Sequence, residues 1–273
     1  MVKFVKGALL TAAVSLALGG IASAAGTLTD AEFKCQGGVS KAGSKFVGSK
    51  SKCAIKCQGN ASKAVEPIAD CYAPYAGLTN TCINDSLKGA EAKFSAAIVK
   101  ACAVDCPECY SGGDCTQESI DRVANIEGQV DSFGPGVFCL GNPTGQNTTP
   151  PSKLELACET NTAKVLSKLV ASINKCYDKC FSNARKALIS VSACAPPASD
   201  PTTAACISAA NGKSVAGVDK KCSVVGPTAV PDCNNDSVDD YPNGAAWTNL
   251  VDIAIEGNVP GTYCPSPSGA FLD

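Results

Sequence analysis

The sequence predicts a mainly α-helical protein built as a tandem duplication of a disulfide-stapled helical domain, a helical hairpin or bundle with long loops. Three observations predict this fold class: a cysteine pattern that occurs twice, apolar residues that recur at helical spacing across it, and almost no strand signal. The chain of 273 residues contains 18 cysteines, an even number that allows every one of them to pair. We therefore expect disulfides to stabilise a fold whose alanine-rich helices bury little apolar surface.

The duplication is seen in the spacing of the cysteines. In each half, four cysteines are separated by 18, 4 and 14 residues, and four more follow at looser intervals. The first four positions of the second copy lie 123 residues after those of the first copy. Cys106 and Cys109 have no counterpart in the second copy. We expect all 18 cysteines to take part in disulfides. The positions that correspond between the two copies are Cys35 and Cys158, Cys53 and Cys176, Cys57 and Cys180, Cys71 and Cys194, Cys82 and Cys206, Cys102 and Cys222, Cys115 and Cys233, Cys139 and Cys264.

Residues 1–24 are predicted to be a signal peptide. Lys3 and Lys6 precede an apolar stretch, and the sequence Ala22-Ser23-Ala24 has the form of a cleavage site. The apolar stretch is shorter than the roughly 20 residues that a membrane-spanning helix requires. Because of its many cysteines, the mature chain is expected to be secreted or periplasmic, with no transmembrane span after signal cleavage.

Three segments follow the signal peptide. Residues 25–144 are predicted to form the first cysteine-rich helical repeat, residues 145–151 a linker, and residues 152–273 the second repeat. The linker ends in Pro150-Pro151, which favours an extended chain just before the second repeat. Each repeat is long enough to form a domain of its own.

Each repeat is predicted to begin with a long helix. A hydroxyl residue followed three positions later by glutamate forms a capping box at Thr29 and again at Ser152. In the second repeat, apolar residues recur at helical spacing to about Ile189, with Asn161-Thr162 as a candidate interruption. The first repeat has a weaker pattern because four glycines disfavour a helix: Gly37, Gly38, Gly43 and Gly48. Further helices are predicted at residues 86–102, 117–131 and 245–255.

Three cysteines of each long helix are predicted to share one face, because intervals of 18 and 4 residues are close to whole numbers of helical turns. They are suited to pair with cysteines of a second helical segment that returns beside the first. We expect a nested ladder of Cys57–Cys71, Cys53–Cys82 and Cys35–Cys102, repeated as Cys180–Cys194, Cys176–Cys206 and Cys158–Cys222. The remaining shared cysteines would pair as Cys115–Cys139 and Cys233–Cys264, although spacing leaves other pairings open.

If the shared cysteines close four bridges within each repeat, the two unshared cysteines are left for each other. A local Cys106–Cys109 disulfide across Pro107-Glu108 is then expected. Thiol–disulfide oxidoreductases use the same Cys-x-x-Cys spacing, but in those proteins the motif opens a helix after a strand. Here it follows a predicted helix and precedes a glycine-containing loop, so a structural cross-link is the preferred interpretation.

Composition argues against several classes of function. The chain has no histidine, which excludes Ser-His-Asp and Cys-His catalysis and histidine-ligated zinc enzymes. Paired Cys-x-x-Cys knuckles, which are typical of structural zinc sites, are missing. The net charge is −2 and the lysines are dispersed, which argues against nucleic-acid binding. We therefore predict that the protein is not an enzyme and has no catalytic residues, no cofactor and no resident metal ion.

One acidic segment resembles the first part of a calcium loop. From Asp232 to Asp240, carboxylate and amide oxygens occur at alternate positions, as they do in an EF-hand. The segment departs from that pattern because Ser237 replaces the glycine and Asn243 replaces the bidentate glutamate. A solvated acidic loop is the preferred interpretation, and calcium binding is the alternative.

These observations favour a secreted or periplasmic, non-enzymatic structural or binding protein made of two eight-cysteine helical repeats. Its partner would be an unidentified protein or envelope component, or another copy of the same chain. The first alternative is a carrier whose helices enclose a cavity for lipid or another small apolar ligand. The second alternative is a thiol–disulfide redox protein that uses Cys106 and Cys109.

Overall fold

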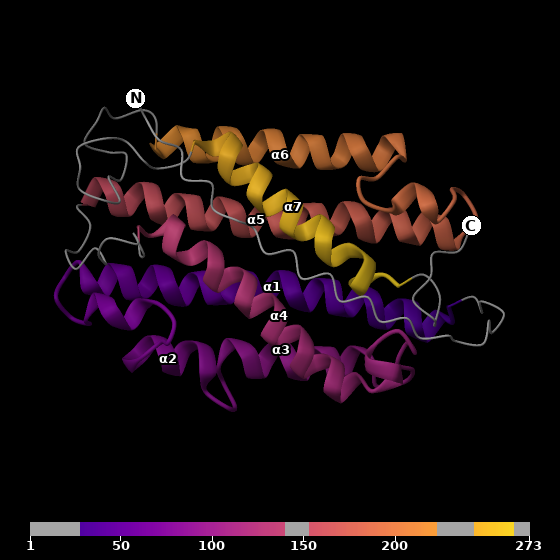
Figure 1. Ribbon diagram of the computed structural model, residues 1–273, viewed down its shortest axis with the longest axis horizontal. Helices are drawn as coiled ribbons and strands as arrows, with labels where there is room; N and C mark the ends of the chain where they lie inside the picture. The colour runs from indigo at the N-terminus through magenta and orange to yellow at the C-terminus, as the bar shows by residue number, and fades with distance from the viewer. Residues whose placement is uncertain (1–27, 140–152, 223–242, 265–273) are drawn as a thin grey trace, which may run out of the picture.

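The structure is a computed structural model that describes residues 28–139, 153–222 and 243–264 (Figure 1). The described residues are mainly helical and contain no strand, as the sequence predicted. They include three short 3₁₀ turns, η1 (Ile68–Cys71), η2 (Ser111–Gly113) and η3 (Ser192–Cys194). The α-helices are α1 (Asp30–Ala61), α2 (Gly77–Asn84), α3 (Ala90–Ala101), α4 (Cys115–Val137), α5 (Lys153–Arg185), α6 (Pro201–Cys222) and α7 (Gly244–Thr262).

The helices form two layers. In the first layer α6, α5, α1 and α3 lie side by side, and α2 lies near α3 (Figure 1). In the second layer α4 and α7 cross this row diagonally, α4 over α3, α1 and α5, and α7 over α6, α5 and α1 (Figure 1). The two long helices, α1 and α5, are therefore at the centre of the molecule and contact both layers.

Helices α1 and α5 are antiparallel. The Ser167 hydroxyl donates to the Ser51 hydroxyl at 2.9 Å, and the Asn174 amide donates to the Ser44 hydroxyl at 2.9 Å. At the end of α5, Arg185 forms an ion pair with Asp30 at the start of α1. Residue numbers that rise along one helix thus fall along the other.

Helix α1 begins with the predicted capping box. The Thr29 hydroxyl accepts the backbone N–H of Glu32 at 3.1 Å, and the Glu32 carboxylate accepts the backbone N–H of Thr29 at 2.7 Å. The other predicted capping residue, Ser152, lies outside the described residues, as do the predicted signal peptide, the predicted linker and the Asp232 to Asp240 segment.

Both long helices run without a break. The candidate interruption at Asn161-Thr162 does not occur, because both side chains find partners on α6. The Asn161 amide donates to the carbonyl oxygen of Gly217 at 2.7 Å, and the Thr162 hydroxyl lies 3.4 Å from the Cys222 sulfur. These contacts use polar groups that would otherwise compete for the helix backbone.

Glycine in α1 permits a close helix contact. A Cβ atom at Gly38 would lie 2.3 Å from the Cβ atom of Ala101 on α3, which is too close for any side chain. The Cys35–Cys102 bridge lies at the same crossing and has a Cα–Cα distance of 4.5 Å. The helix therefore tolerates the low propensity of Gly38 because only glycine lets α1 and α3 approach to this distance.

Six disulfides form the predicted ladders, three in each half of the chain. On α1 the bridges are Cys35–Cys102, Cys53–Cys82 and Cys57–Cys71, and on α5 they are Cys158–Cys222, Cys176–Cys206 and Cys180–Cys194. They fasten each long helix to the chain that returns beside it. All described cysteines are disulfide-bonded.

Three predicted bridges are wrong. Cys106 pairs with Cys115, and Cys109 pairs with Cys264, so neither Cys106–Cys109 nor Cys115–Cys139 nor Cys233–Cys264 forms. The prediction assumed that each half closes its own shared cysteines. Instead, the C-terminal end of α7 packs beside the loop before α4, which brings Cys264 to Cys109 from the other half of the chain.

Each half has an apolar core. One core lies between α1, α3 and α4, where the Phe46 and Phe94 rings stack with centroids 4.9 Å apart. The larger core lies between α5, α6 and α7 and includes buried Ile173, Tyr177 and Trp247. In the described part of the chain, no helix has the length and apolar character needed to cross a membrane.

Two glycines on α1 give a matched test of this packing. Gly38→Ala should destabilise the fold by about 1–3 kcal/mol, because the new methyl group overlaps Ala101. Gly37→Ala should stabilise it by roughly 0.5–1 kcal/mol, because the space there is open and alanine favours helix. Guanidinium unfolding of the oxidised protein measures both changes, and equal changes at the two positions would contradict the close α1–α3 contact.

A non-reducing peptide map tests the bridge between the two halves. Two proteases, one that cleaves after glutamate and one that cleaves before aspartate, together cut at Glu108 and before Asp114, and so place Cys106, Cys109 and Cys115 on three separate peptides. Mass spectrometry of the unreduced digest should then find Cys109 linked to a peptide that contains Cys264, and Cys106 linked to one that contains Cys115. A product in which Cys106 and Cys109 are joined to each other would contradict this arrangement.

Candidate functional site

A cavity of about 340 Å³ lies between the two helix layers. Helices α1 and α5 form its floor, and α4 and α7, which cross above them, form its roof. The loop that contains Tyr72 and Tyr75 lies at one side. The cavity is therefore placed where the diagonal crossing of α4 and α7 leaves the two central helices incompletely covered.

Most of the cavity wall is apolar. Val47 on α1 and Val170 on α5 belong to the floor, and both are half-buried. The roof residues Val130, Phe133 and Ile255 face them. Leu166, Ile126, Val251 and Val259 extend the same apolar surface. Such a wall suits a hydrocarbon chain or ring system, since contact with it removes apolar surface from water.

A charged cluster lies at one end of this wall. Lys50 is 1 % exposed, and its Nζ atom lies 2.5 Å from Glu127 Oε1 and 2.7 Å from Asp131 Oδ1. The Tyr75 hydroxyl donates to Asp131 Oδ1 at 2.5 Å, and the Tyr75 ring lies under the Lys50 ammonium at 5.0 Å. Of these groups, Lys50, Tyr75 and Asp131 line the cavity, whereas Glu127 does not.

A further acid, Glu91 on α3, lies beside the cluster. Burial, together with the nearby Glu127 carboxylate, raises the pKa of Glu91 to about 7. Burial and the hydrogen bond to Asp131 also raise the pKa of Tyr75, which keeps its hydroxyl protonated and able to donate. Three carboxyl groups therefore surround the single ammonium group of Lys50.

A second polar group closes the floor of the cavity near the end of α7. The buried Tyr263 hydroxyl lies 2.7 Å from the Ser40 hydroxyl and donates to Asp178 Oδ1 at 2.6 Å. Burial raises the pKa of both Tyr263 and Asp178. The Tyr263 ring stacks on Phe181 with centroids 4.6 Å apart, so the side chain is fixed in place.

Arg122 joins the two roof helices. Its guanidinium pairs with Glu118 on α4 and donates to the Gly261 carbonyl oxygen at 2.5 Å and to the Thr262 hydroxyl at 3.1 Å. The Tyr110 hydroxyl donates to the Thr262 carbonyl oxygen at 2.5 Å. The positive charge of Arg122, which also lines the cavity, is thus neutralised by its own helix.

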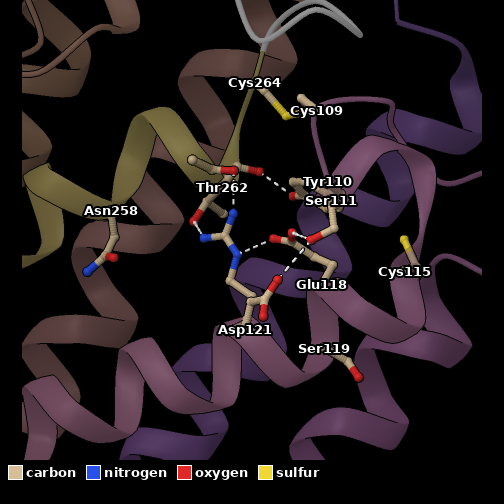
Figure 2. A network of polar contacts seen from close by, with 12 residues as sticks. Cys109, Tyr110, Ser111, Cys115, Glu118, Ser119, Asp121, Asn258, Thr262 and Cys264 are labelled. Atoms are coloured by element: carbon tan, nitrogen blue, oxygen red, sulfur yellow. Dashed lines mark hydrogen bonds and ion pairs between the residues drawn. A yellow bond between two sulfur atoms is a disulfide. The ribbon is translucent and has the colours of Figure 1, made fainter. Parts of the chain in front are cut away.

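The loop before α4 completes this closure. The Ser111 hydroxyl bonds to Glu118 and Asp121 at 3.0 Å each, and the Cys109–Cys264 bridge ties the same loop to the end of α7 (Figure 2). Further along the roof, the amides of Gln129 and Asn258 bond to each other. The two roof helices are therefore held together both covalently and by hydrogen bonds.

The cysteines frame the cavity and offer no reactive group to it. Among the described cysteines, Cys71 alone lines the wall, and it is bonded to Cys57. The sulfurs of Cys35, Cys102 and Cys115 lie within 4.8 Å of one another, a spacing compatible with a metal ion. They belong to two disulfides, however, and only thiolates are effective metal ligands.

The residues that form the cavity carry little sequence signal. Val47, Val170 and Val130 read as ordinary positions of an apolar helix face, and Lys50 reads as one of many dispersed lysines. Burial of Lys50 beside Glu127 depends on α4 crossing α1, 77 residues away in the chain. Among the lining residues, Gly43 and Cys71 belong to groups that the sequence pattern picks out, the glycines of the first long helix and the repeated cysteines.

Away from the cavity, α5 carries a buried carboxyl group. Glu159 is 1 % exposed, and its Oε2 atom has no hydrogen-bond partner among the described residues. Burial, with a contribution from Glu155, raises its pKa to about 8. Gln36, which follows Cys35 as Glu159 follows Cys158, is equally buried and donates to the Cys264 carbonyl oxygen at 2.6 Å.

Comparison of the chain with protein-family models, curated proteins and solved structures finds no match.

The Glu159 carboxyl group should make stability depend on pH. The native state keeps this proton up to about pH 8, whereas the unfolded chain releases it near the usual pKa of 4.5. The stability that it provides is therefore complete below pH 4.5 and is lost as the pH rises through 8. Glu159→Gln should stabilise the protein by roughly 2–4 kcal/mol at pH 9 and change it little at pH 5. Urea unfolding at both pH values measures this, with the exposed Glu108→Gln as control, and a shift that is independent of pH would contradict it.

Proposed function

We propose that the protein is an exported binding protein that carries a small, mainly apolar ligand in the cavity between its two helix layers. The cavity is the observation that carries this proposal. Its volume of about 340 Å³ is within the usual range for small-molecule sites. Its wall combines a continuous apolar surface with a few fixed polar groups, which is the common composition of such sites.

Export accords with the chemistry of the cysteines. The many disulfides are consistent with an extracellular or periplasmic location, where oxidising conditions preserve them. The proposed signal peptide, residues 1–24, would direct the chain there. Disulfides also allow a carrier to keep an internal cavity, because cross-links supply stability that close packing would otherwise provide.

A tandem duplication accounts for the shape of the site. The ladder bridges close loops of similar sequence separation in the two halves, 67 and 64, 29 and 30, and 14 and 14 residues. Val47 and Val170, 123 residues apart, both line the floor. We infer that the two repeats supply equivalent helices to one shared cavity, α1 with α5 and α4 with α7.

The carrier proposal makes the broader expectation of a non-enzymatic structural or binding protein more specific. The redox alternative receives no such support. It depended on a local bridge between Cys106 and Cys109, and these cysteines belong to two different disulfides.

Filling the cavity tests the proposal. The neutral dye N-phenyl-1-naphthylamine should become fluorescent on binding to the oxidised mature protein. Val170→Trp should abolish this signal with little loss of stability, because the indole enters existing space. In a close-packed interior the same change would cost about 1–3 kcal/mol. Val104→Trp, at a position that is 89 % exposed, is the control and should bind dye normally. Equal dye binding by both variants, or none by the wild type, would contradict the proposal.

A further inference from the structure

The charges around the cavity indicate which class of ligand it accepts. Among the residues that the structure describes, Lys50 and Arg122 are the two cations that line it. Lys50 already pairs with Glu127 and Asp131, and Arg122 already pairs with Glu118 and two further oxygen atoms. Neither cation has a charge left to neutralise an anionic headgroup, since each is matched or outnumbered by carboxylates.

The excess charge at the Lys50 end is negative. The charged groups that face one another there come from three helices: Lys50 on α1, Glu91 on α3, and Glu127 and Asp131 on α4. Tyr75, from the neighbouring loop, contributes only a neutral hydroxyl. With Glu127 and Asp131 ionised, the cluster has a net charge of about −1, and ionisation of Glu91 makes it more negative.

Asp131 is the group that presents this charge to the cavity. Its side chain is 21 % exposed and belongs to the cavity wall. Lys50 and Tyr75 both bond to Oδ1, and within the described part of the chain Oδ2 accepts no hydrogen bond. An ammonium group that entered from the cavity would find a carboxylate oxygen with an unused acceptor site beside an apolar wall.

We propose that the cavity selects a cationic amphiphile, a primary amine on a single apolar chain, whose ammonium group pairs with Asp131 while the chain lies between α1, α5, α4 and α7. This inference rests on the proposed carrier function. The cavity should bind an ammonium compound more tightly than a neutral alcohol with the same chain, and the alcohol more tightly than the carboxylate. A fatty-acid anion would be repelled by Asp131, because both cations of the wall already have partners.

Three ligands with the same chain separate charge from hydrophobic binding. Decylamine, decanol and decanoate are titrated at pH 8, below their aggregation limits, against the dye bound to the oxidised mature protein. Decylamine should displace the dye at a concentration at least about tenfold lower than decanoate, with decanol between them. Equal or stronger displacement by decanoate would overturn the proposed selectivity and leave the carrier function intact. Absence of binding by the dye and by decanol would instead overturn the carrier function itself.

Substitutions on α4 assign the preference to one carboxylate. Asp131→Asn should reduce the difference between decylamine and decanoate to less than about threefold. Asp121→Asn, the same change at an exposed position outside the cavity wall, should leave it unchanged. If Asp131→Asn does not fold, Tyr75→Phe provides the opposite test. Loss of the Tyr75 hydrogen bond leaves Asp131 less neutralised, so the preference for decylamine should increase. A preference that neither variant alters would overturn the role of Asp131.

The pH dependence provides a second readout. Because the pKa of Glu91 is about 7, the cluster gains negative charge between pH 6 and pH 8. Binding of decylamine, which stays protonated over this range, should tighten as the pH rises, while binding of decanol should not change. Weaker decylamine binding at pH 8 than at pH 6 would contradict the proposal.

Discussion

The bridging of each long helix to its return segment is the constraint on which the other features depend. Cys35, Cys53 and Cys57 lie on one face of α1 and fix the segments that contain α2 and α3 against it, and α5 holds α6 in the same manner. Because these faces are covered, each of α1 and α5 has one side that contacts the other long helix and one face that contacts α4 and α7. The two-layer arrangement follows from this allocation of helix surface (Figure 1).

The same cross-links make an internal cavity compatible with a stable fold. Side chains that line a cavity lose packing contacts, and this loss lowers stability as the cavity becomes larger. Disulfides restrict the unfolded chain and so offset part of that loss without filling the space. A ligand that binds only the folded state would add to stability in proportion to its concentration and affinity. The architecture therefore suits a protein whose interior is completed by a bound molecule.

Polar interactions determine how the roof is attached to the floor. Lys50 connects α1 to α4 through Glu127 and Asp131, and Arg122 connects α4 to the end of α7. Each cation is largely buried, and each has carboxylate partners at short range, so neither charge is left without compensation. These contacts fix the positions of the charged groups at the cavity wall, and a fixed charge distinguishes between ligands more sharply than an exposed and mobile one.

The sequence by itself determined the helical class and six of the bridges, because both depend on local periodicity. Intervals of 18 and 4 residues place three cysteines on one face of each long helix, where they are suited to pair with a segment that returns beside that helix. The capping box at Thr29 is also local and was predicted correctly. Only the tertiary structure decided that α1 and α5 lie antiparallel, that Cys109 pairs with Cys264, and that Lys50 is buried beside Asp131. Each of these contacts joins segments far apart in the chain, and their geometry is set by how the helix layers cross rather than by any spacing along the sequence.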